Sequence, residues 1–455
     1  MTTTPKRSWL GRVGPRGLII LRAGGWSLTA KAIAAVNLFV TFPFVMRSLG
    51  AAEFGVWATL VSVITFVGFL DFGIGNGAMN MIADARGRKR DDEIAAILRE
   101  AARTLMTIAA IMLIGVVFAA FLPWWRILRL PAAEAAQARV AALVVLTVAT
   151  VSVPLSLATR AQLGLGMGHV AFRWQAVGQG VALIATIFAA LIDAGLAWLV
   201  AASLTSTVVP AVLNGVSLWR HPLHGNRRPV ACAARPDIRA RIRRDGALFF
   251  ALQLGGALAF TIDLPLIAAI RGPAEAGEYA VVQRLFSLIS LSLSLIWVPL
   301  WPVYRHAMAA SENAWVSRTL VWTLGGAGAF ALLIATAFAG FFPWIATFWL
   351  HREFTAPAAL LVGFVVWSAL DALGQAFATF LNAAGILTFQ VAVAVALSIL
   401  ALTLKVLGLS FWGISVVPWC TATAYVLASV IPTLMRLPAL LRQGHAVASE
   451  ARGNL

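Results

Sequence analysis

The stretch "LGAAEFGVWA", residues Leu49–Ala58, returns as "RGPAEAGEYA", residues Arg271–Ala280, 222 positions further along the chain. At this offset Gly50, Ala52, Glu53, Gly55 and Ala58 align with Gly272, Ala274, Glu275, Gly277 and Ala280. A weaker echo pairs "ATRAQLGLG" near Arg160 with "ATFLNAAGI" near Asn382 at nearly the same offset. Two matches in register predict that the chain is a duplication of one structural unit.

The composition is that of an integral membrane protein. Of 455 residues, 60% are hydrophobic and 12% are charged, whereas a soluble protein carries about 25% charged residues. The formal net charge of +17 fits a membrane protein whose cytoplasmic loops collect Lys and Arg. No basic soluble module indicates nucleic-acid binding. The two cysteines, Cys232 and Cys420, give no disulfide framework.

Apolar runs of about twenty residues are long enough to span a bilayer. The chain holds twelve, at 25–47, 52–81, 104–123, 139–159, 171–192, 195–219, 246–270, 277–303, 318–342, 356–381, 386–407 and 412–435. Six spans in each half give both halves the same topology, related by an axis along the membrane normal. We therefore predict an all-α membrane protein with a short N-terminal segment, a six-helix bundle, a basic linker, a second six-helix bundle and a tail, at 1–24, 25–219, 220–244, 245–437 and 438–455.

The positive charges predict the orientation. If the N-terminus is cytoplasmic, cytoplasmic segments hold 26 of the 35 Lys and Arg residues, and the opposite side holds six. This bias predicts that both termini lie in the cytoplasm. Aromatic residues near span ends, as in "FFPWIATFW" (341–349), are expected to anchor the protein at the membrane interface.

The stretch "LGAAEFGVWATLVSVITFVGFLDFGIGNG" (49–77) resembles the first two helices of bacterial polysaccharide flippases, which belong to the MATE-like exporter superfamily. "FTIDLPLIAAIRGPAEAGEYAVVQRL" (260–285) is similar to their matching region in the second half, except that Leu264-Pro265 follows Asp263 where many relatives have a basic residue. The resemblance implies two bundles around a central cavity and alternating access. It also implies an undecaprenyl-diphosphate-linked oligosaccharide as cargo, the bacterial inner membrane as location, and polysaccharide polymerase and chain-length proteins as partners.

Charged residues within spans are costly and usually face a partner or an aqueous cavity. Lys31 and Asp71 lie at similar predicted depth in the first two spans, so we expect them to pair, either as a structural salt bridge or as part of the substrate cavity. The remaining alternative is that Asp71 only reaches the lipid headgroups. Anionic lipids are also expected partners of the basic linker.

The second half carries four more intramembrane charges. Asp263 and Arg284 flank the same predicted outer loop, so we expect a pair, in which the arginine fork suits a cargo diphosphate. Asp371 has no basic residue at its depth. Because desolvation favours a neutral carboxyl, Asp371 is a candidate for proton coupling, or a hydrogen-bonded acid with no transport role. Lys405 is expected to snorkel to the outer interface.

Two rival functions remain open. A MATE-type cation-coupled drug exporter would favour an acidic cavity, whereas the spans hold three acids and three bases. A membrane polysaccharide polymerase or ligase would need a catalytic constellation, usually on a sizeable outer loop, and the predicted outer loops are short. We therefore expect a transporter that is not an enzyme, without a metal site or cofactor.

Overall fold

The computed structural model describes residues 15–64, 70–88, 90–127, 135–220, 236–309, 312–351, 353–384 and 386–439, which fold into helices and contain no strand. The start of the N-terminal segment, 221–235 of the basic linker and the tail from residue 440 lie outside these ranges, as do short stretches of both predicted bundles, among them 65–69 of the predicted span 52–81.

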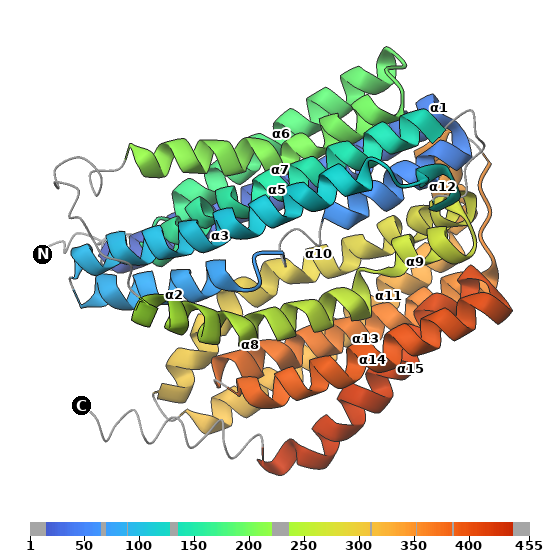
Figure 1. The fold of residues 1–455 in the computed structure, drawn as a ribbon. Coiled ribbons are helices and arrows are strands. Elements are labelled where there is room, and N and C mark those ends of the chain that lie inside the picture. Colours follow the sequence, from blue (N-terminus) through green and yellow to red (C-terminus); the bar gives the residue numbers. More distant parts are fainter. Residues whose placement is uncertain are drawn as a thin grey trace, which may run out of the picture.

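The first half of the chain, called the first lobe, forms α1 (Pro15–Val63), α2 (Ile74–Gly87), α3 (Asp91–Ala119), α4 (Trp124–Ile127), α5 (Ala135–Gly164), α6 (Gly168–Leu191) and α7 (Leu196–Trp219). The second lobe forms α8 (Pro236–Phe260), α9 (Asp263–Ile270), α10 (Pro273–Ala309), α11 (Asn313–Gly340), α12 (Phe342–Leu350), α13 (Ala358–Ala383), α14 (Leu387–Trp412), η4 (Ile414–Val416), α15 (Val417–Tyr425) and η5 (Val426–Val430). In Figure 1 the blue-to-green first lobe lies above the yellow-to-red second lobe.

The helices agree with twelve spans, although several are divided differently from the prediction. Among the described residues, ten helices are long and apolar enough to cross a membrane, and α8 with α9 forms an eleventh span that is bent by 47°. The twelfth is contained in α1, which is two helices joined at Gly50. The predicted span 52–81 is not one helix, because residues 70–73 form a turn before α2 begins at Ile74, with positive φ at Phe72 and Gly73. The α8 helix begins at Pro236, within the predicted linker.

The aligned glycines of the repeat have equivalent structural roles. Gly50 and Gly272 both have positive φ, 72° and 105°, a conformation that suits glycine because it has no Cβ. Each lies at the turn between the first two spans of its lobe. Five residues later in each lobe, Gly55 and Gly277 meet one another: a Cβ on Gly277 would lie 3.2 Å from Gly55 Cα. The two copies of the repeated stretch therefore contact one another at the boundary between the lobes.

We call the side of the molecule on which α1 begins the near side, and the side that carries Gly50 and Gly272 the far side. The lobes touch on both. On the far side one hydrophobic cluster joins them, and it includes Phe54, Trp57, Tyr279 and Phe286. On the near side α2 and α3 pack against α8, where a Cβ on Gly73 would lie only 2.0 Å from Gly246 O.

An ion pair reinforces the near-side contact. Buried Glu100 on α3 accepts hydrogen bonds from Arg239 Nε of α8, at 2.9 Å, and from Arg103 Nη1 of its own helix, at 3.0 Å. Since α3 and α8 belong to different lobes, Glu100 ties the lobes together on this side.

Candidate functional site

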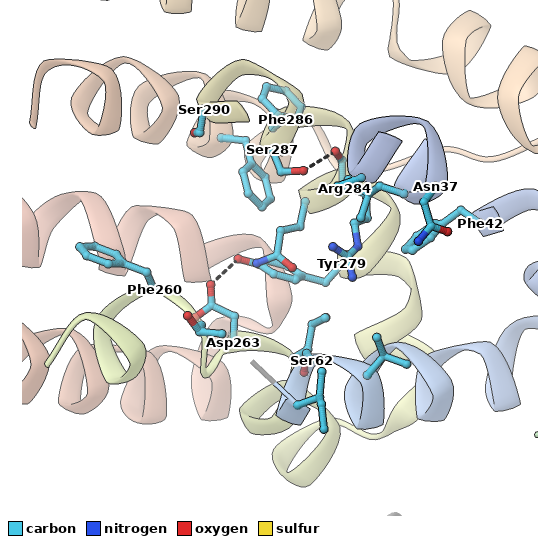
Figure 2. Close-up of a pocket in the computed structure, with 18 of the residues that line it drawn as sticks. Asn37, Phe42, Ser62, Phe260, Asp263, Tyr279, Arg284, Phe286, Ser287 and Ser290 are labelled. Atoms are coloured by element: carbon cyan, nitrogen blue, oxygen red, sulfur yellow. Dashed lines mark hydrogen bonds between the residues drawn. The ribbon is translucent and has the colours of Figure 1, made fainter. Parts of the chain in front are cut away.

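A cavity of about 610 Å³ lies between the lobes, and both contribute to its wall. Its first-lobe lining includes Asn37, Thr41, Phe42, Trp57, Ser62 and Gln179. Its second-lobe lining includes Asp263, Tyr279, Arg284, Ser290, Asp371 and Gln375. Hydroxyls, amides and aromatic rings are thus mixed with a few charges, and α1 and α10 supply much of the surface (Figure 2). A wall of this kind can hold a polar ligand by hydrogen bonds and ring contacts.

Arg284 brings a positive charge into this cavity from α10. Its guanidinium lies over the Phe42 ring of the first lobe, 5.3 Å from the ring centroid, in a cation–π arrangement. Figure 2 shows the side chain extending from α10 into the pocket. Its Nε atom is buried and has no hydrogen-bond partner in the described part of the chain. A buried donor without a partner is costly, so this guanidinium is prepared for an acceptor that enters the cavity.

Asp263 does not pair with Arg284, so that prediction is wrong. Its Oδ1 accepts a hydrogen bond from Lys405 Nζ of α14 at 2.5 Å, and its Oδ2 accepts one from Tyr279 Oη of α10 at 2.8 Å. The expectation for Lys405 is also wrong: its side chain is 0% exposed and does not reach the interface. The reason is geometric: α14 packs on the bend between α8 and α9, which places the Lys405 ammonium next to the Asp263 carboxylate.

Asp371 is held by neutral groups, in agreement with the absence of a basic residue at its depth. Ser290 Oγ donates to its Oδ2 at 2.6 Å, and Gln375 Nε2 donates to its Oδ1 at 3.4 Å. The residue lines the cavity from α13. Its role in proton coupling stays a prediction.

Lys31 and Asp71 do not form the predicted pair, and neither is among the residues that line this cavity. Lys31 Nζ donates to Ser294 Oγ of α10 at 3.1 Å, across the lobe boundary. Asp71 is buried and accepts the backbone N–H groups of Gly73, at 2.9 Å, and Gly75, at 3.1 Å. The carboxylate therefore satisfies buried backbone donors at the start of α2, which have no partner within the helix and where negative charge is favoured.

Several lining residues had no charge to draw attention to them. Asn37 Nδ2 donates to Gln179 Oε1 at 3.0 Å, and Ser287 and Ser290 follow Arg284 at helical spacing on one face of α10. This serine spacing was a usable sequence signal.

Trp349, expected at the membrane interface, instead donates from Nε1 to Phe39 O at 2.7 Å and stacks on the Phe39 ring.

Comparison with known protein families and solved structures shows what the chain is similar to. Residues 20–308 match the family model described as "Polysaccharide biosynthesis protein". No curated protein sequence matches the chain. Among solved structures, the chain is similar to a multidrug resistance MATE family transporter of the MOP superfamily in an inward-facing conformation, with TM-score 0.68, 16% identity, and 94% and 96% of the two chains covered.

The outward-facing conformation of a MATE family transporter of the MOP superfamily gives TM-score 0.66 at 16% identity, with 94% and 96% of the two chains covered. A MOP superfamily transporter from Pyrococcus furiosus, reported to have a binding pocket of reversed polarity that suggests a different function, gives TM-score 0.66 at 15% identity, with 96% and 99% covered. These similarities show a MATE-like fold, and at this identity they show the fold alone.

Proposed function

Since the chain belongs to the polysaccharide biosynthesis protein family, we propose that it is a flippase for undecaprenyl-diphosphate-linked oligosaccharide. The cargo would pass from the inner to the outer leaflet of the bacterial inner membrane. The near side would face the cytoplasm, together with both termini. Because the lobes touch on both sides of the cavity, alternating access requires one contact to open while the other stays closed.

The observation that carries the proposal is the placement of Arg284. An arginine can bind two phosphate oxygens at once, because its donors form a planar fork. Its Nε has no partner in the described chain, and Asp263, the nearby acid, is neutralised by Lys405. The surrounding hydroxyls, amides and aromatic rings offer contacts suited to sugar hydroxyls and sugar faces.

A MATE-type drug exporter is supported by the fold and by Asp371, an acid in the cavity wall that has no basic partner in the part of the chain that the structure describes. Arg284 opposes this alternative, because it adds positive charge to the same cavity and would repel a cationic drug. A polymerase or ligase is less well supported, because the family match and the transporter fold both favour transport over catalysis.

The proposal is tested with purified protein and farnesyl diphosphate as a short diphosphate lipid. We expect it to raise the melting temperature of the wild type, to raise that of Arg284→Lys less, and to leave Arg284→Ala unchanged. Arg139→Ala, at an exposed arginine of α5, is the matched control and should respond as the wild type does. Farnesol tests whether the diphosphate is what binds.

The same variants are tested in cells from which the native gene has been deleted. Arg284→Ala should abolish surface polysaccharide at a normal protein level, and Arg139→Ala should restore it. If Arg284→Ala instead shows normal surface polysaccharide, and farnesyl diphosphate raises its melting temperature as much as that of the wild type, then Arg284 does not bind the cargo.

A further inference from the structure

The seventh span is broken at the cavity wall. The α8 helix ends at Phe260, α9 starts at Asp263, and the two axes differ by 47°. The carbonyl of Ala259 lies in the last turn of α8, where carbonyl groups lack intrahelical partners. The break therefore places a helix C-terminal carbonyl and the Asp263 carboxylate side by side in the middle of the second lobe.

The ammonium of Lys405 occupies the space between these two oxygens. Nζ donates to Ala259 O at 2.6 Å and to Asp263 Oδ1 at 2.5 Å. The side chain is 0% exposed, and Tyr279 Oη donates to the second carboxylate oxygen. The charge is thus held by a carboxylate and a backbone carbonyl, deep in the protein.

In transporters with broken helices, half-helix C-terminal ends and unwound carbonyls coordinate the coupling cation. We propose that Lys405 is a tethered substitute for such a cation: its ammonium fills a monovalent-cation site built from Ala259 O and the Asp263 carboxylate. As long as the lysine is present, this lobe binds no free sodium at the break. The inference does not depend on the identity of the cargo.

The first lobe does not repeat this site. The 222-residue offset pairs Asp263 with Thr41, a neutral residue whose hydroxyl bonds to Asn37 O at 2.7 Å. Gly50 is the one non-helical residue inside α1, so the helix is not broken at Thr41. The proposed cation site and the break that exposes the carbonyl are therefore present in one half of the duplication and not in the other.

The contact between Lys405 and Asp263 could equally be an ordinary salt bridge. Truncation of Lys405 distinguishes a salt bridge from a cation site. Lys405→Ala removes the ammonium and leaves a space next to Asp263, which lines the cavity, so sodium can enter. Lys405→Met removes the charge but fills the space with an apolar chain. A cation site predicts that sodium rescues only the first variant, whereas a salt bridge predicts that it rescues neither.

The experiment measures melting temperature in sodium chloride and in choline chloride at equal ionic strength. We expect Lys405→Ala to melt lower than the wild type in choline, and to gain a constant step for each tenfold rise in sodium above its dissociation constant. The wild type, Lys405→Met and the double variant Asp263→Asn/Lys405→Ala should show no difference between the salts.

Equal melting of Lys405→Ala in sodium and choline would overturn the proposal. If too little of this variant folds in choline, the amount of folded protein extracted from membranes is compared between the two salts, and equal amounts overturn it likewise. A sodium-dependent rise in the wild type would also overturn it, because the site would then be open to a free ion.

Discussion

At Gly55 the backbones of the two lobes are in close contact on the far side. A Cβ on this residue would lie 1.7 Å from Pro273 O and 3.1 Å from Gly277 N, all backbone atoms that cannot rotate away. Real Cβ contacts are essentially never shorter than 3.0 Å. In Gly55→Ala the two helices must therefore separate by at least about 1.3 Å, the difference between 3.0 and 1.7 Å.

The cost of this separation falls on conformations in which the far side is closed. Overpacking of a well-packed contact typically costs about 1–3 kcal/mol. Conformations with the far side open lack the contact and do not bear this cost. A coupling free energy of about 1–3 kcal/mol corresponds to a shift of roughly 5–150-fold. We therefore expect Gly55→Ala to increase the far-side-open population by a factor in this range.

The assay follows the reaction of a cysteine in the cavity with a membrane-impermeant maleimide. The native cysteines are replaced (Cys232→Ser, Cys420→Ala), and Ser287→Cys reports from the cavity wall. On the proposed topology the far side faces outward in intact cells. Labelling should be faster in Gly55→Ala and unchanged in the control Gly326→Ala, where a Cβ meets nothing within 4 Å. Wild-type labelling of folded Gly55→Ala would refute the reasoning.

Two further predictions concern the near side. Glu100→Gln should weaken the contact between α3 and α8 by about 1.5 kcal/mol, the low end for hydrogen bonds to charged groups, because Arg239 is 38% exposed and solvent screens the pair. Labelling of Ser287→Cys in inside-out vesicles should therefore become faster. Glu93→Gln, which affects the Arg90–Glu93 pair at the start of α3, should leave the labelling unchanged. Asp71→Ala should lower the free energy of unfolding by about 0.5–2 kcal/mol, as loss of a helix cap does. Asp71→Asn should lower it by less, because the amide keeps one acceptor oxygen. Thermal denaturation measures both variants, and an unchanged melting temperature in Asp71→Ala would contradict the capping role.

The sequence was sufficient to predict the class of fold. The apolar runs located the spans, and the aligned pairs Gly50/Gly272 and Gly55/Gly277 predicted the duplication; that they lie at the turns and at the lobe contact is seen in the structure. Glycine is informative here because positive φ and close helix approach both depend on the absence of a Cβ. Hydropathy did not reveal the turn at 70–73 or the break after Phe260, because the residues on both sides of each are largely apolar.

The pairing of charges could not be predicted, because sequence gives the depth of a residue but not its direction around the helix axis. Lys31 and Asp71 were matched by depth, yet Lys31 points to Ser294 on α10 and Asp71 to the start of α2. Asp263 and Arg284 were matched by proximity to one loop. The true partner of Asp263 is Lys405, which is 142 residues away in sequence and is brought close by the packing of α14 on the helix break.

The α10 helix connects the far-side lobe contact to the cavity and to Lys31 of the first lobe. From the far side to the near side it carries Gly277 at the lobe contact, Tyr279 on Asp263, Arg284 and Ser290 in the cavity, and Ser294 on Lys31. It is one unbroken helix, Pro273–Ala309. A rigid element of this kind transmits a displacement at one end to groups along its length. Opening the far side at Gly277 should therefore also move Arg284 relative to Phe42 of the first lobe. Separation of the far-side contact and movement of the residue proposed to bind the cargo would then occur together, so that opening of the far side is coupled to release of the cargo.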